Sequence, residues 1–187
     1  MIELITDIDF PTDFDKNFRL RLYKINDKEI FKIEYAIVIY KNVNKGDVIP
    51  IRIHSECKTG ESFSSCKCDC KEQLDTMLKF IHTMDKGLII YLPQEGRGIG
   101  IVNKLMAYSI QERFGYNTFE ANSYLNLEID SRNYNMCSEI LQDFHVKNVV
   151  LFTNNKLKFE TIKKAFPRAL KINTSSTCNE FNTKYIS

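Results

Sequence analysis

The stretch LIIYLPQEGRGIG, residues 88–100, joins a short apolar run to a glycine-rich loop. The run at 88–92 follows Gly87 and is typical of a short buried β-strand. After the loop, hydrophobic spacing predicts a helix from about Gly100 to Phe114, with a stop at Gly115. The apolar residues of this predicted helix are Leu105, Met106, Tyr108 and Ile110. A strand, a loop and a helix in succession indicate an α/β protein.

The segments on either side extend this pattern. Upstream, β-branched and aromatic residues predict strands at 19–25, 30–41 and 48–54, which we expect to form an antiparallel meander. Downstream, helices alternate with strands. The predicted elements are a helix that begins at Cys70 and carries Leu74, Met77, Leu78 and Ile81, a helix at 131–144, a strand at 148–153, a helix at 157–166 and a strand at 169–172. We therefore predict an α/β fold with a mixed sheet flanked by helices.

Composition and charge narrow the classes of protein. The 187 residues are 43% hydrophobic, and they contain no repeat and no linker-like tract, so we expect a single domain over 1–187 with a mobile tail at 174–187. The net charge of +2 gives no general attraction to nucleic acid. The acidic start MIELITDIDF and the lack of a long apolar run predict a cytoplasmic protein with no membrane partner.

Four of the six cysteines lie within the segment HSECKTGESFSSCKCDC, residues 54–70. In a reducing cytosol such a cluster indicates metal binding or catalysis rather than disulfides. Zinc prefers thiolate ligands, and a catalytic site supplies three of them and leaves the fourth position open. On an extended backbone Cys66, Cys68 and Cys70 would share one face, so spacing alone leaves the choice of three ligands open. His54 is a ligand, a neighbour that hydrogen-bonds a ligand, or an ordinary strand residue, and we favour the second role.

The loop QEGRGIG at 94–100 aims backbone N–H groups at a position suited to an anion, although it matches neither of the common phosphate-loop motifs. Glu95 can accept from the N–H edge of guanine, and Arg97 can bind phosphate through two N–H groups. Three polar patches follow, at 120–122 (EAN), 130–132 (DSR) and 153–158 (TNN-K-x-K). The last comes directly after a predicted strand, where α/β proteins bind ligands.

Together these motifs resemble the GTP cyclohydrolase II family, in order from about Arg52 to Lys158. The resemblance rests on HSEC-x-T-G ending in C-D-C, then QEGRGIG-x-x-N-K, AY, EAN, D-x-R and TNN. It implies that the zinc ligands are Cys57, Cys68 and Cys70, with Cys66 left out. It further implies that Asp130 is a proton acceptor, Arg132 a nucleophile and Tyr108 a residue near the attacked purine carbon. The GTP-binding residues that it implies are Arg52, His54, Glu56, Gln73, Glu95, Gly96, Arg97, Thr118, Thr153 and Lys158.

The implied reaction opens riboflavin biosynthesis. GTP and water give formate, pyrophosphate and 2,5-diamino-6-(5-phosphoribosylamino)pyrimidin-4-one, in a homodimer that uses zinc and holds magnesium on the phosphates. Two alternatives remain. One is a relative that retains the formamide or uses another purine nucleotide. The other is a non-catalytic nucleotide-binding protein whose metal site is closed by Cys66 as a fourth ligand.

An arginine nucleophile needs a base, because guanidinium stays protonated at ordinary pH. Asp130 lies two residues from Arg132, and the two side chains share a face only on an extended backbone. We therefore expect both residues just before the helix that follows them. The alternative role for Arg132 is to stabilise charge that builds on the phosphates.

Overall fold

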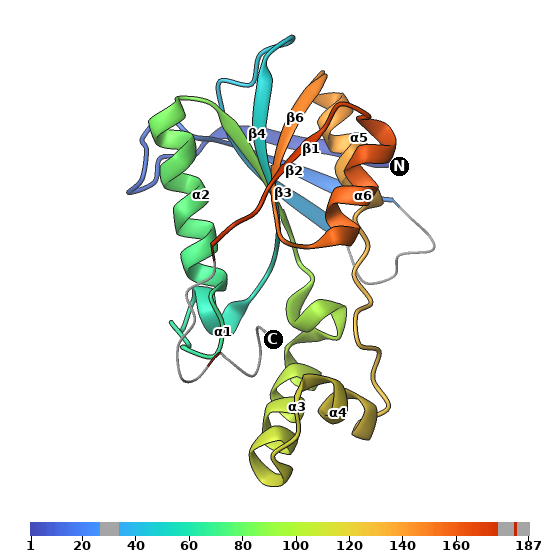
Figure 1. Ribbon diagram of the computed structural model, residues 1–187. Coiled ribbons are helices and arrows are strands. Elements are labelled where there is room, and N and C mark those ends of the chain that lie inside the picture. Colours follow the sequence, from blue (N-terminus) through green and yellow to red (C-terminus); the bar gives the residue numbers. More distant parts are fainter. Residues whose placement is uncertain (27–33, 176–181, 183–187) are drawn as a thin grey trace. The chain divides into compact units, whose positions relative to one another are not determined.

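The computed structural model describes residues 1–26, 34–175 and 182 (Figure 1). The chain divides into two compact units. The first, here called the sheet unit, comprises Met1–His54, Leu74–Leu92 and Asn133–Ser175. The second, here called the loop unit, contains Ser55–Gln73 and Pro93–Arg132. The expectation of a single domain stays a prediction. The expected mobile tail lies outside the described residues except for 174, 175 and 182.

The sheet unit is built on one seven-stranded sheet with the strand order β1-β2-β3-β5-β4-β6-β7. The pairs β1–β2, β2–β3 and β3–β5 are antiparallel, whereas β4–β6 and β6–β7 are parallel. The strands are β1 (Ile2–Asp9), β2 (Arg19–Ile25), β3 (Tyr35–Lys41), β4 (Val48–Ser55), β5 (Gly87–Leu92), β6 (Asn148–Phe152) and β7 (Leu170–Ile172). The predicted α/β class with a mixed sheet is confirmed.

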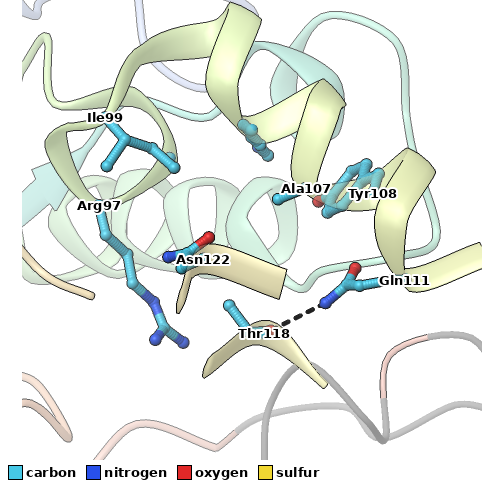
Figure 2. Close-up of a pocket in the computed structure, with 9 residues that line it drawn as sticks. Arg97, Ile99, Ala107, Tyr108, Gln111, Thr118 and Asn122 are labelled. Atoms are coloured by element: carbon cyan, nitrogen blue, oxygen red, sulfur yellow. Dashed lines mark hydrogen bonds between the residues drawn. The ribbon is translucent and has the colours of Figure 1, made fainter. Parts of the chain in front are cut away.

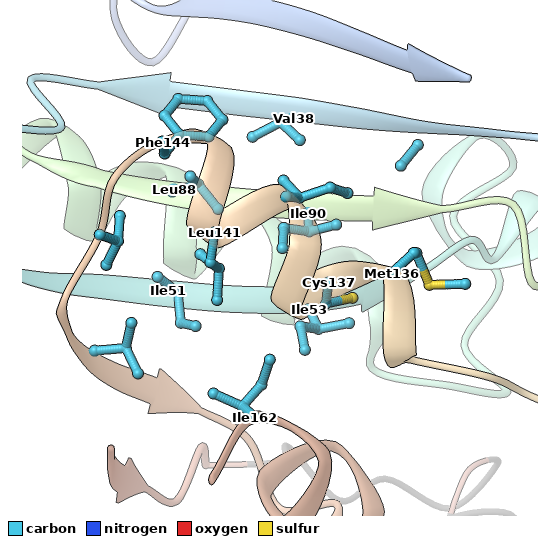
Figure 3. Close-up of a cluster of buried hydrophobic side chains, with 14 of the residues drawn as sticks. Val38, Ile51, Ile53, Leu88, Ile90, Met136, Cys137, Leu141, Phe144 and Ile162 are labelled. Atoms are coloured by element: carbon cyan, nitrogen blue, oxygen red, sulfur yellow. The ribbon is translucent and has the colours of Figure 1, made fainter. Parts of the chain in front are cut away.

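Helices cover both faces of this sheet, because its central strands are buried on both sides. In β5, Leu88 and Ile90 pack in the main core cluster, whereas Ile89 packs in a second cluster with Ile81 of α2. Alternate side chains of a strand point to opposite faces, so the strand needs a layer on each side. Figure 3 shows α5 and α6 against the main cluster. The helices are α1 (Lys58–Glu61), α2 (Cys70–Met84), the 3-10 turn η1 (Glu95–Gly98), α3 (Gly100–Phe114), α4 (Thr118–Tyr124), α5 (Asn135–Asp143) and α6 (Lys156–Ala165).

Several boundaries and pairings differ from the predictions. The predicted antiparallel meander was wrong at its third strand, β4. In the sheet β5 lies between β3 and β4, so these two strands do not pair. Strand β1 was missed; it pairs with β2 and carries an irregularity between Leu4 and Thr6. The helix predicted over 131–144 begins only at Asn135. Part of the strand predicted at 30–41 lies outside the described residues.

Predictions about individual side chains had mixed outcomes. The helix over 100–114 is present, but the apolar face assigned to it was partly wrong, since Leu105 and Met106 are about half exposed. Cys137, which lies outside the cysteine-rich segment, is a buried core residue. His82 of α2 contacts Asp15. No helix in the described ranges is long and apolar enough to cross a membrane.

A buried charge cluster in the sheet unit is centred on Asp15. Its Oδ2 lies 2.6 Å from Lys41 Nζ and 2.7 Å from His82 Nδ1, and Lys41 also contacts the Asp85 carboxylate. The hydrogen bonds from Lys41 and His82 hold the pKa of Asp15 well below its usual range. The cluster therefore ties the segment before β2 to β3 and to α2.

Replacement of Asp15 by Asn should destabilise the protein, because it removes the more deeply buried partner of the Lys41 ammonium. Breaking a buried pair costs about 3–5 kcal/mol, and we expect a loss near the lower figure because Lys41 keeps Asp85. The ionised Asp15 stabilises the fold above the ordinary carboxyl pKa of about 3.9, and its contribution is lost as pH falls toward the lowered folded-state pKa. Urea unfolding at pH 7 and at lower pH should show the difference from wild type shrinking in acid.

The control is Asp13→Asn, since Asp13 is fully exposed in its pair with Lys16. Equal unfolding free energies for wild type and Asp15→Asn at pH 7 would contradict the prediction.

Candidate metal centre and nucleotide site

Three cysteine side chains converge in the loop unit. Cys57 directly precedes α1, Cys68 lies in the loop after it and Cys70 begins α2. Their Sγ atoms all lie within 4.8 Å of one another, and the Cys57 and Cys68 atoms are 3.5 Å apart. Tetrahedral ligands at a Zn–S distance of about 2.3 Å are separated by about 3.8 Å. The donor atoms and their spacing therefore fit a thiolate-bound metal ion.

A glycine lies directly beneath this cluster. A Cβ atom added to Gly60 would lie 2.7 Å from Cys68 Sγ and 3.3 Å from Cys57 Sγ. Real Cβ atoms do not approach sulfur so closely, so any larger residue would displace the thiols. The Thr-Gly pair of the sequence motif thus leaves space for the three sulfur atoms on one side of α1.

Cys66 lies apart from the three clustered thiols. Its side chain is exposed, and it is not among the residues that form the candidate metal group. The backbone at 66–67 forms a turn rather than an extended strand. The turn interrupts the alternation of side chains, which is why Cys66 does not share the face of Cys68 and Cys70.

A buried ion pair borders the cluster. Lys104 Nζ in α3 lies 2.8 Å from Glu95 Oε1, 3.1 Å from Cys57 Sγ and 2.9 Å from Thr59 Oγ1. Burial opposes the charge on Lys104, but the Glu95 hydrogen bond and the neighbouring Tyr108 and Cys57 raise its pKa overall. Hydrogen bonding by Cys68 and Cys70 lowers the pKa of the Cys57 thiol, and the Lys104 ammonium adds to this effect. The surroundings thus favour a thiolate at Cys57.

The Glu95 carboxylate organises the start of the glycine loop. In addition to Lys104, it accepts hydrogen bonds from the backbone N–H of Gly96 at 3.0 Å and of Lys58 at 2.6 Å. An ionised carboxylate offers about four acceptor positions. Described residues use three of them, so among these residues one position remains for a ligand.

The glycine loop packs on the segment that carries Asp130 and Arg132. The amide of Ser131 donates to the carbonyl of Arg97 at 3.0 Å. Gly98 has a φ of +90°, and a Cβ there would lie 2.6 Å from Ser131 Oγ. Gly96 and Arg97 also have a positive φ of 61° each. Two motifs that the sequence analysis treated separately are therefore joined, and Gly98 permits their close approach.

Asp130 and Arg132 form a two-pronged ion pair. Arg132 donates from Nε to Asp130 Oδ1 at 2.8 Å and from its terminal nitrogen to Oδ2 at 2.5 Å. Both residues precede α5, so their predicted position before the helix is confirmed. Burial raises the pKa of Asp130, but hydrogen bonding and charge from Arg132 outweigh it and lower the pKa overall. The pair therefore stays ionised.

A pocket lies between α3 and α4 beside this loop (Figure 2). Arg97, Tyr108 and Thr118, three of the predicted site residues, line it together with Asn122. Thr118 Oγ1 accepts from Gln111 Nε2 at 3.2 Å. Asn122 is 2% exposed, and its Oδ1 atom has no hydrogen-bond partner in the described part of the chain. The pocket thus offers a cation, hydroxyl groups and an amide acceptor to a polar ligand.

Two further predicted residues belong to the loop unit. Gln73 donates to Asp69 Oδ2 at 2.5 Å in the first turns of α2. Glu56 lies beside Lys58, and burial raises the pKa of its carboxyl. Neither residue lines the pocket between α3 and α4.

The other predicted residues lie in the sheet unit, where β4 and β6 run parallel. Arg52 Nε donates to His54 Nδ1 at 3.1 Å near the end of β4. Thr153 follows β6, and Lys158 Nζ in α6 donates to the Ile53 carbonyl at 3.0 Å. All four of these polar side chains are more than nine-tenths buried. They cluster where parallel strands end, as the position of the TNN patch predicted.

The fold and the thiol cluster define an α/β protein with a cysteine-based candidate metal centre. Residues 3–166 match the family model described as GTP cyclohydrolase II. The chain belongs to the GTP cyclohydrolase II family.

Curated relatives carry the same description. A GTP cyclohydrolase-2 of Haemophilus influenzae is 39% identical over 99% of this chain and 84% of its own length. A GTP cyclohydrolase-2 of Acinetobacter baumannii is 38% identical over 99% of this chain and 91% of its own length. One from Archaeoglobus fulgidus is 44% identical over 88% of this chain but only 42% of its own length.

The fold also resembles a solved structure. A two-domain 3,4-dihydroxy-2-butanone 4-phosphate synthase from A. baumannii aligns with a TM-score of 0.50 at 14% identity. The alignment covers 93% of this chain and 40% of that one. At this identity the likeness concerns the fold alone.

Sequence reasoning gave no role to Lys104, although it quoted the N-K pair that follows the glycine loop. A signal was available, because Lys104 lies four residues before Tyr108 and so shares a helix face with one of the residues expected to face the core. A charged residue at such a position indicates a buried partner. The carbonyl of Arg97 accepts a hydrogen bond from the backbone N–H of Ser131. Because both groups belong to the backbone, the residue types gave no signal of this contact.

Replacement of Gly60 by Ala should weaken metal binding, because the new methyl group would displace Cys68 and Cys57. Overpacking costs about 1–3 kcal/mol, which corresponds to a loss of roughly 5- to 150-fold in zinc affinity. Competition with a chromophoric chelator measures the affinity. Ser62→Ala, at an exposed position just after α1, is the control and should bind zinc as wild type does. Unchanged affinity in Gly60→Ala would show that the thiols do not bind the ion.

Proposed function

We propose that this protein is a zinc-dependent GTP cyclohydrolase II. It hydrolyses GTP to formate, pyrophosphate and 2,5-diamino-6-(5-phosphoribosylamino)pyrimidin-4-one, the first step of riboflavin biosynthesis. Membership of the family and the likeness to full-length relatives support this activity. The observation that carries the zinc assignment is the convergence of Cys57, Cys68 and Cys70 within 4.8 Å.

Zinc held by these three cysteines would keep one position open and act as a Lewis acid that activates water near neutral pH. The bond to be opened lies at the guanine carbon between the two imidazole nitrogens. The neighbouring protein groups have matching chemistry. Glu95 keeps one acceptor position that suits a guanine N–H, and Arg97 with Thr118 and Asn122 can bind polar groups of the nucleotide in the pocket. Tyr108 lines the same pocket, and we assign it a place near the reacting carbon.

For Arg132 the geometry supports charge stabilisation rather than nucleophilic attack. A guanidinium that donates two hydrogen bonds to a carboxylate is stabilised in its protonated form, which has no lone pair for attack. The same carboxylate has a lowered pKa, which makes Asp130 a weak base. We assign Asp130 the role of orienting Arg132 toward the phosphates.

The proposal includes the residues of the sheet unit and a second metal ion. Lys158 and Arg52 are buried cations, and Thr153 and His54 lie beside them in sequence motifs of the family. These groups suit the triphosphate, and Mg²⁺ would neutralise the rest of its charge. Turnover should therefore require magnesium in addition to zinc.

A homodimer is also part of the proposal. Helices α3 and α4 expose Val102, Leu105, Met106, Phe119 and Tyr124, and Phe114 packs against Tyr124 at 5.6 Å between ring centroids. Exposed apolar groups of this kind are typical of interfaces between proteins. The molar mass in solution, measured by light scattering, distinguishes a dimer from a monomer.

The non-catalytic alternative requires Cys66 as a fourth ligand, and the exposed position of Cys66 weighs against it. The relative that retains the formamide differs only in its product. Both alternatives are separated from the proposal by one assay.

Zinc-loaded protein incubated with GTP and Mg²⁺ should release formate and pyrophosphate, and mass spectrometry should detect the pyrimidine without its formyl carbon. Cys68→Ser should abolish turnover, because two thiolates do not complete the ligand set, whereas Cys66→Ser should retain wild-type activity. Intact GTP in the wild-type reaction, or loss of activity in Cys66→Ser, would refute the proposal. A nucleotidyl adduct on the intact protein, seen by mass after rapid quenching, would instead favour nucleophilic attack by Arg132.

A further inference from the structure

Lys104 is a buried cation in contact with a candidate metal ligand. It is 4% exposed, although it lies in a helix whose neighbouring residues Leu105 and Met106 are about half exposed. Its ammonium has three donor hydrogens, and three acceptors surround it within 3.1 Å: Glu95 Oε1, Thr59 Oγ1 and Cys57 Sγ. Every donor therefore has a partner, and all of these residues belong to the loop unit.

A simple stabilising ion pair would not need this arrangement. A buried ammonium is costly, and its pairing with a carboxylate often does no more than offset that cost. Glu95 alone would satisfy the charge, yet the ammonium also reaches the sulfur atom that approaches Cys68 to 3.5 Å. The contact joins three parts of the site: the glycine loop, Cys57 at the start of α1, and helix α3.

We propose that Lys104 is a positioning residue for the metal centre, donating a hydrogen bond to the Cys57 thiolate and fixing its sulfur as a ligand. This inference rests on the proposed function, because it requires that the three cysteines bind zinc. Hydrogen bonds from groups around the ligands orient those ligands and tune the metal. The same ammonium holds Glu95, so the geometry of the metal centre and of the glycine loop depend on one side chain.

The hydrogen bond has a spectroscopic consequence that a purely structural role lacks. A donor to thiolate sulfur lowers the energy of the sulfur lone pair, which raises the energy of charge transfer from sulfur to a bound metal. Zinc has no such visible bands, but Co²⁺ in its place reports on the thiolates. Loss of the donor should shift the sulfur-to-cobalt band to longer wavelength.

Lys104→Met removes both charge and donor, and Lys104→Gln removes the charge but keeps an amide donor. We expect Lys104→Met to lose about 10- to 100-fold in zinc affinity and to shift the cobalt band to longer wavelength. Lys104→Gln should show a smaller change in both. The matched control is Arg113→Met, which removes a positive charge from an exposed position of the same helix and should behave as wild type.

The outcomes are distinct. Wild-type protein that binds neither Zn²⁺ nor Co²⁺ would overturn the proposed function and this inference with it. Wild-type binding together with an unshifted band and unchanged affinity in Lys104→Met would overturn this inference alone, even if the variant unfolds at lower temperature. If Lys104→Met does not fold, Lys104→Gln decides by the same two measurements.

Discussion

The buried carboxylate of Glu95 is the interaction on which the loop unit depends. It receives one side-chain ammonium and two backbone N–H groups, from α3, the glycine loop and the start of α1. Within the described residues, none of these three donors contacts another carboxylate. Because an uncompensated buried charge is costly, the Glu95 carboxylate and its three donors are stable only together. The short helix α1, with four residues, could not hold the thiol-bearing segment without them.

This interdependence explains why the candidate metal centre and the pocket between α3 and α4 are parts of one arrangement. Gly60 leaves room for sulfur, and Gly98 leaves room for the segment of Asp130 and Arg132. Lys104 contacts the first region and also lines the pocket with Arg97. The cysteine segment, the glycine loop and the D-x-R motif are separate in the sequence, but in the structure they contact one another.

Periodicity in the sequence predicted the elements that bury a continuous core. The strand at 88–92 and the helix at 100–114 were identified because their apolar residues or flanking glycines are local signals. The position of β5 between β3 and β4 could not be predicted, since it depends on pairing between distant segments. Helix α4 was missed because it is short and its signal is a capping box between Asn117 and Glu120 rather than an apolar period.

For the site, spacing identified the cysteine segment but could not select among four thiols. The choice required the turn at Cys66, which no periodicity reports.

The missed strand β1 has a consequence beyond the fold. It forms one edge of the described sheet, and its irregular register and the acids Glu3, Asp7 and Asp9 make that edge a poor template for another strand. The edge is thus protected against the strand-to-strand growth that leads to aggregates.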